Sequence, residues 1–196
     1  VLMKALKKRK VEAVACSVVI ESERDALAAL EELYENEVNA VVVYLGNFGP
    51  EGPTTIFADE FDGPVMVCAA AEENAKMLQK SRGDALCGML NVSYNLGLRR
   101  VSAYIPQMPV GLADELAEKI EEFVPIARTV LGAGSLKVFT FGPRPQDFYA
   151  CNAPIQPLYD MGIEVMENSE LDLLRLYKDA AGKTKEIAAV AADMKK

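Results

Sequence analysis

The chain alternates between two patterns of apolar positions. Short, unbroken apolar runs rich in β-branched residues are typical of parallel strands covered on both faces. They predict strands at 11–19, 40–45, 64–70, 101–105, 136–141 and 163–166. Between them, apolar residues recur every three or four positions, which is the pattern of amphipathic helices. This spacing predicts helices at 1–10, 21–35, 54–61, 72–79, 85–98, 114–131, 153–161, 170–180 and 184–195.

Strands that alternate with helices indicate βαβ units. We therefore predict an α/β fold: a Rossmann- or flavodoxin-like three-layer α/β/α domain with a mainly parallel sheet over residues 1–134, and the incomplete beginning of a second α/β unit over 135–196. The chain opens in mid-helix without an initiator Met and ends on a helix with no returning strand. We expect it to be a fragment of a longer protein.

Local signals mark several helix ends. Ser22 is a predicted N-cap for the helix at 21–35. Ser169 caps the helix at 170–180, with Asp172 at the capping-box position in place of the usual Glu. Gly132 and Gly134 are expected to end the helix at 114–131.

Charge and composition exclude several classes of protein. The formal net charge of −8 argues against a sequence-independent nucleic-acid binder, which needs a basic stripe. No apolar run approaches the ~20 residues of a membrane span, and nothing resembles a secretory signal. The four cysteines form no C-x-x-C pair, which favours free thiols in a reducing compartment. We predict a cytoplasmic protein without nucleic-acid or membrane partners.

The chain contains no histidine. It therefore cannot supply a Ser-His-Asp or Cys-His arrangement, or an imidazole metal ligand. Any catalysis would rest on carboxylates, Lys, Tyr or Cys, or on groups that lie outside this chain. We assign no catalytic residue, metal ligand or cofactor to the chain itself.

The segment 41–53 is the most informative, because an apolar strand stops in a loop of three glycines and two prolines. Ligands of open α/β sheets bind at the carboxyl ends of parallel strands. Asn47 and Phe48 present an amide beside an aromatic ring, a combination suited to sugars: the amide reads hydroxyls and the ring packs against C–H surface. Phe48 plugging the end of the sheet is the alternative. Glu51, in the same loop, is a further candidate ligand.

Further candidate ligands are Gln79 and Arg82, which precede a helix start, and Arg144, in a loop stiffened by prolines. The local alternatives stay open. Asp84 is either a helix cap or a ligand, and Arg144 with Asp147 can form an exposed ion pair of little energetic value.

Four segments taken together, 41–53, 79–90, 93–101 and 136–148, resemble the L-fucose and L-arabinose isomerase-like family in order and spacing. The resemblance implies an aldose–ketose isomerase in which two carboxylates move protons between C1 and C2 through an enediol. A divalent metal, typically Mn²⁺ held by Glu, Asp and His, would polarise the carbonyl in the full-length protein. It also implies a homo-oligomer in which this first domain helps to close a neighbouring subunit's sugar pocket.

By position, the resemblance makes Phe48 an aromatic at the sugar pocket, Gln79 a polar contact to the sugar and Arg144 part of the second domain's lining. The metal ligands and acid–base carboxylates belong to later sequence. We therefore expect this chain to contribute pocket and oligomer surface for an aldose or ketose, and to be inactive alone. A non-catalytic cytoplasmic sugar-binding or sensing domain is the alternative, and a purely oligomerising domain is a third.

Overall fold

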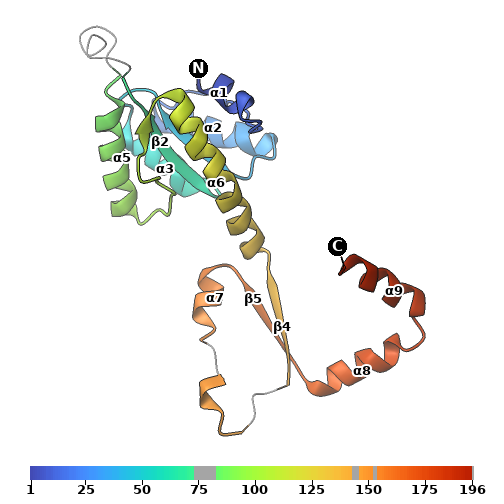
Figure 1. Ribbon diagram of the computed structural model, residues 1–196. Coiled ribbons are helices and arrows are strands. Elements are labelled where there is room, and N and C mark those ends of the chain that lie inside the picture. The colour runs from blue at the N-terminus through green and yellow to red at the C-terminus, as the bar shows by residue number, and fades with distance from the viewer. Residues whose placement is uncertain (73–82, 143–145, 152–153, 196) are drawn as a thin grey trace. The chain divides into compact units, whose positions relative to one another are not determined.

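The structure is a computed structural model that describes residues 1–72, 83–142, 146–151 and 154–195. The chain divides into two compact units, Val1–Leu131 and Gly132–Lys196. Each unit has its own small parallel sheet (Figure 1).

A three-stranded parallel sheet forms the centre of the first unit, with the strands in the order β1 (Val41–Leu45), β2 (Val65–Ala70) and β3 (Val110–Gly111). Val41 pairs with Val65, and Ala69 pairs with Val110. Five consecutive residues of β2 are buried. This burial on both faces explains why β2 is an unbroken apolar run.

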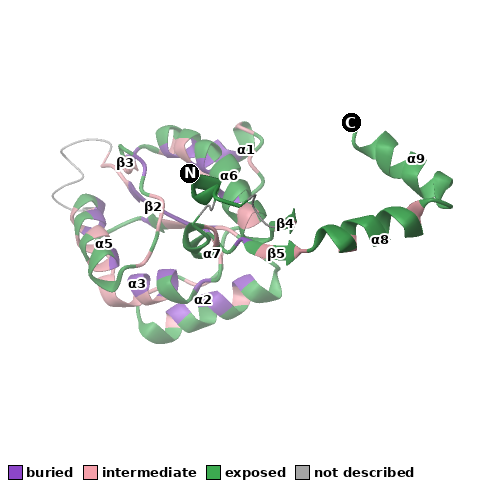
Figure 2. Cartoon of the chain, turned by 90° about the horizontal axis from the view of Figure 1, so that it is seen from below, coloured by how far each residue is buried: buried purple, intermediate pink, exposed green. Residues whose placement is uncertain are grey.

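Helices cover both faces of this sheet (Figure 2). Successive side chains of a strand point to opposite faces. Val65, Val67 and Ala69 accordingly join one core with helices α2 (Glu23–Glu35), α3 (Glu51–Glu60) and α5 (Ala85–Arg99), whereas Met66 and Cys68 join a second core with α1 (Leu2–Lys8) and α6 (Ala113–Gly134). The predicted three-layer α/β/α fold is confirmed.

The second unit pairs strand β4 (Lys137–Phe141) in parallel with β5 (Glu164–Asn168). Its other elements are the 3₁₀ turn η1 (Tyr149–Cys151) and helices α7 (Gln156–Asp160), α8 (Glu170–Ala180) and α9 (Thr184–Asp193). The capping box of α8 forms as predicted, and the hydrogen bond from the Ser169 hydroxyl lowers the pKa of Asp172.

Two predicted strands are wrong. Residues 11–19 form no strand, and the Ser17 backbone N–H donates to the Glu32 carboxylate (2.8 Å) instead of to a neighbouring strand. Residues 101–105 supply a single bridge, between Tyr104 and Met66. Two prolines, at 106 and 109, follow, and proline cannot donate to a ladder. The third strand forms beyond them, at Val110–Gly111.

Most predicted helices are confirmed, including α2 with Ser22 as its N-cap, whose hydroxyl accepts from the Asp25 backbone N–H (3.3 Å). Helix α6 ends at Gly134, in the Gly132–Gly134 stretch expected to stop it. The helix expected at 72–79 lies almost wholly outside the described residues. Among the described residues, no helix combines the length and apolar character needed to span a membrane.

Candidate functional site

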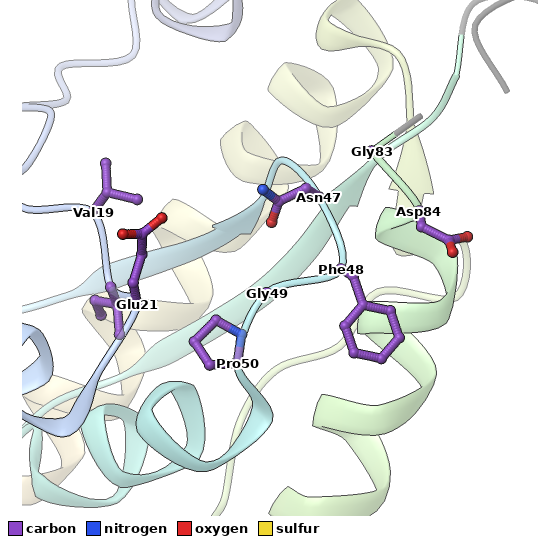
Figure 3. Close-up of a pocket in the computed structure, with 9 residues that line it drawn as sticks. Val19, Glu21, Asn47, Phe48, Gly49, Pro50, Gly83 and Asp84 are labelled. Atoms are coloured by element: carbon purple, nitrogen blue, oxygen red, sulfur yellow. The ribbon is translucent and has the colours of Figure 1, made fainter. Parts of the chain in front are cut away.

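A pocket of about 450 Å³ lies at the carboxyl end of β1 (Figure 3). Three segments of the first unit enclose it: 19–21 before α2, the loop 47–50 between β1 and α3, and 83–84 before α5. Its lining residues are Val19, Ile20, Glu21, Asn47, Phe48, Gly49, Pro50, Gly83 and Asp84. The pocket therefore lies at the strand end where open α/β sheets bind ligands.

The loop 47–50 turns sharply from β1 into α3. Gly49 has φ +64°, a left-handed conformation that glycine adopts without steric cost. Pro50 follows as the N-cap of α3 with extended backbone (φ −82°, ψ 120°). The Gly-Pro pair thus forms the turn that leads from the residues after β1 into α3.

Two glycines let α5 approach this loop closely. A Cβ at Gly88 would lie 2.3 Å from the Phe48 carbonyl oxygen, and one at Gly83 would lie 2.8 Å from the Gly46 carbonyl oxygen. No side chain fits at either distance without displacing backbone. A glycine inside a helix costs about 1 kcal/mol of helix stability relative to Ala. A glycine at such a position therefore indicates close packing, and this was the sequence signal for the contact.

The structure places Asn47 and Phe48 in the pocket, but on different sides of the loop. Figure 3 shows the Asn47 amide extended toward the 19–21 segment, whereas the Phe48 ring points away from that segment. Phe48 remains 43% exposed, so its ring does not plug the end of the sheet. Asn47 and Phe48 are both exposed.

Glu51 is not among the residues that line the pocket. Its carboxylate accepts a hydrogen bond from the Asn95 Nδ2, which joins the first turn of α3 to α5. Asn95 also donates to the Asn91 carbonyl oxygen (3.0 Å). The described contacts of Glu51 therefore fix two helices that flank the pocket.

The other candidates divide between described and undescribed parts of the chain. Gln79, Arg82 and Arg144 lie outside the described residues. Asp84 occupies the N-cap position of α5 with φ 55°, makes no side-chain capping bond there, and lines the pocket. Its backbone N–H donates to the Glu72 carboxylate (3.0 Å).

Glu21 was not among the site residues predicted from the sequence. The structure places Glu21 in the pocket, one residue before the N-cap Ser22. No local pattern could have found it, because its position depends on how the 11–20 segment crosses the core, where Cys16, Val18 and Ile20 pack.

The polar side chains that line the pocket are an amide and two carboxylates, from Asn47, Glu21 and Asp84. Ionised carboxylates only accept hydrogen bonds, whereas an amide both donates and accepts. Hydroxyl groups suit this set, since each can donate to a carboxylate oxygen.

The described residues do not fit a metal centre. No group of three or more His, Cys, Asp or Glu side chains is placed among them to hold an ion. The chain also lacks histidine, so the ligand set implied by the resemblance is not available here.

A protein-family model described as fucose/sulfoquinovose isomerase, N-terminal domain, matches residues 1–133. The chain belongs to this family. The match spans the whole first unit and all three segments of the pocket, and it confirms the resemblance to sugar isomerases. No curated protein matches the chain. Within this isomerase domain, the strand-end pocket is the site that the described residues support best.

Proposed function

We propose that this isomerase N-terminal domain supplies one wall of the sugar pocket of an aldose–ketose isomerase. The pocket at the end of β1 carries the proposal, since it combines polar acceptors, an amide and an aromatic ring in about 450 Å³. Glu21 and Asn47 hydrogen-bond to hydroxyls of the sugar on one side of the loop, and the exposed Phe48 ring offers an apolar surface on the other side (Figure 3). The substrate is an aldose or ketose.

The reacting groups belong to other parts of the functional protein. Isomerisation through an enediol needs groups that remove and return a proton, and a metal would stabilise the developing oxyanion. We assign the Mn²⁺ implied by the resemblance to residues outside the described ones, among which no group of three or more His, Cys, Asp or Glu side chains is placed to hold an ion. The role of this chain is to bind and orient the sugar. We also propose that the functional protein is a homo-oligomer in which one copy completes the sugar pocket of a neighbour.

The Asn47→Ala variant of the native gene product tests this role. We expect KM for the preferred aldose to rise about tenfold with kcat little changed, because a contact made equally in ground and transition states affects binding alone. Asn39→Ala is the matched control, since Asn39 is an exposed amide that precedes β1 at the opposite end of the strand. An unchanged KM in Asn47→Ala would show that Asn47 makes no contact with the sugar.

An activity assay of the native gene product distinguishes the proposed isomerase from the alternative, a non-catalytic sugar-binding domain. Interconversion of an aldose and a ketose, followed by nuclear magnetic resonance with Mn²⁺ present, supports the proposal. Saturable sugar binding without interconversion across a panel of aldoses would favour the sensing domain instead.

A further inference from the structure

Strand β1 has the composition of a central strand but lies at an edge of its sheet. Its five residues, Val-Val-Val-Tyr-Leu, include no charge and no proline. Natural edge strands usually carry charges, prolines or bulges, which keep other strands from pairing with them. Among the described residues, β1 pairs with β2 alone, and its Tyr44 is 43% exposed whereas the paired Cys68 is fully buried. The second edge of β1 is therefore open and unprotected.

This open edge presents unpaired backbone groups. The Val41 N–H donates to the Pro64 carbonyl oxygen (3.0 Å), so the backbone of Val41 faces β2. Backbone groups of successive residues in a strand point to opposite edges, so those of Val42 and Tyr44 face away from β2. In the part of the chain that the structure describes, no group accepts a hydrogen bond from either N–H. A row of such groups is a template for one more strand.

An apolar segment, 11–20, runs beside the same core without joining the sheet. Its Val18 and Ile20 pack against the core that contains β1. Its Val14 and Val19, in contrast, are 81% and 76% exposed. The segment has the unbroken apolar composition of a buried strand, yet no strand forms in it. One strand placed between this segment and β1 would supply a partner to both.

The positions of the helices show where such a strand belongs. Helices α2, α3 and α5 pack in one core on one face of the sheet, whereas α1 packs in the other core on the opposite face. Connections between parallel strands are almost always right-handed, so helices on opposite faces connect strands in opposite directions along the sheet. From segment 11–20 the chain advances through α2 to β1, and through α3 to β2. A strand that leads into α1 therefore lies on the β1 side of segment 11–20.

We infer that a parallel β-strand of about five residues occupies the sheet between segment 11–20 and β1, and that it is the segment of the native gene product that leads directly into α1. We expect it to be apolar, because helices cover both faces of this sheet. The resulting order across the sheet is segment 11–20, the inferred strand, β1, β2 and β3.

The inferred strand would end at the candidate pocket. Residues 19–21 and 47–50, which follow its two neighbours in the sheet, both line this pocket (Figure 3). The order of the strands reverses here, and ligands of doubly wound sheets bind in the crevice at such a reversal. The residues after the inferred strand should therefore complete the pocket lining. The inference rests on the fold of the first unit and not on the proposed sugar or reaction, so its test and the isomerase assay can fail independently.

Hydrogen exchange of the native gene product, measured residue by residue with mass spectrometry, tests whether the edge is occupied. We expect the Val42 and Tyr44 amides to exchange as slowly as the Val41 amide, which is bonded to β2 and is the matched control. In the 196-residue chain the Val42 and Tyr44 amides should exchange about a hundredfold faster than the Val41 amide, because nothing pairs them. Fast exchange of both amides in the native gene product would overturn the inference, and so would slow exchange of both in the 196-residue chain.

Single proline substitutions identify the segment that protects these amides. Proline has no N–H and therefore removes a ladder hydrogen bond. Introduced one at a time into the residues that precede α1 in the native gene product, prolines within the inferred strand should speed exchange at Val42 or Tyr44 and leave Val41 protected. If none of these prolines changed the exchange of either amide, another segment or chain would cover the edge and the inference would be wrong. A native gene product with fewer than about five residues before α1 would also overturn it.

Discussion

Gly88, in the first turns of α5, packs directly against the Phe48 carbonyl, at the loop that carries the candidate sugar contacts. A Cβ at Gly88 would lie 2.3 Å from that oxygen, closer than a side chain can approach backbone. The close approach of the pocket loop to α5 therefore depends on glycine, which has no side chain, at position 88.

Gly88→Ala should destabilise the chain by about 1–3 kcal/mol, because overpacking against backbone exceeds the gain of about 1 kcal/mol in helix propensity. Gly97→Ala, in the same helix, is the control: a Cβ there meets nothing within 4 Å, so the variant should be more stable by about 0.5–1 kcal/mol. Urea unfolding at low chain concentration measures both. Equal effects of the two substitutions would show that the Phe48 contact does not constrain the loop.

The hydrogen bond between Glu51 and Asn95 should couple α3 to α5. We expect Glu51→Ala and Asn95→Ala each to cost about 1–2 kcal/mol, since each leaves a part-buried polar partner unsatisfied. The double variant should lose less than the sum of the two single losses, by about 1 kcal/mol, in a double-mutant cycle of urea unfolding. Additive losses would contradict the coupling, and would leave the carboxylate of Glu51 available for the ligand role expected from the sequence.

Features of the fold that depend on local sequence could be predicted, whereas features that depend on distant partners could not. Ser22 caps α2 because the acceptor and the N–H that it serves are three residues apart. The apolar run of β2 reveals its burial directly. The run at 11–19 has a similar composition, but the Ser17 N–H is satisfied by the Glu32 carboxylate, 15 residues away, and no strand forms.

The same distinction applies to the pocket. Asn47 and Phe48 could be singled out because they immediately follow a strand and precede a Gly-Pro turn. Their contact with sugar stays a prediction. Glu21 could not be found, because a carboxylate beside a helix start is usually solvated surface, and only the path of the preceding segment brings it to the pocket.

The free energy of unfolding at acid pH should depend on Glu32. Hydrogen bonds from the Ser17 hydroxyl (2.5 Å) and backbone N–H lower the pKa of the Glu32 carboxyl in the folded chain. A lowered folded pKa contributes stability above the unfolded pKa of Glu, and this contribution is lost as the pH falls through the folded value.

Glu32→Gln removes that titration, so its stability should fall less steeply with decreasing pH below the usual pKa of Glu. Urea midpoints measured from neutral to acid pH check this, with Glu31→Gln as the control, since Glu31 is an exposed neighbour on the same helix. Parallel pH profiles for Glu32→Gln and the wild type would refute the role of Ser17.

The four free cysteines should differ sharply in reactivity. Burial raises the pKa of the Cys68 thiol to about 12, so almost none of it is thiolate near neutral pH, and no reagent reaches it. Cys151 is exposed. Alkylation of the native chain, followed by mass spectrometry of peptides, should therefore modify Cys151 first and leave Cys68 unmodified until the chain is unfolded in urea. Early modification of Cys68 in folded protein would contradict its place in the core.

Isomerase activity should be absent from the 196-residue chain by itself. Among the described residues, no group of three or more His, Cys, Asp or Glu side chains is placed to hold a metal ion, and the chain has no histidine. We expect no aldose–ketose interconversion above background when the chain is incubated with Mn²⁺ and a panel of aldoses, while the native gene product shows turnover in the same assay. Activity in the isolated chain would place the reacting groups within residues 1–196, and would overturn the division between a binding domain here and catalytic groups elsewhere.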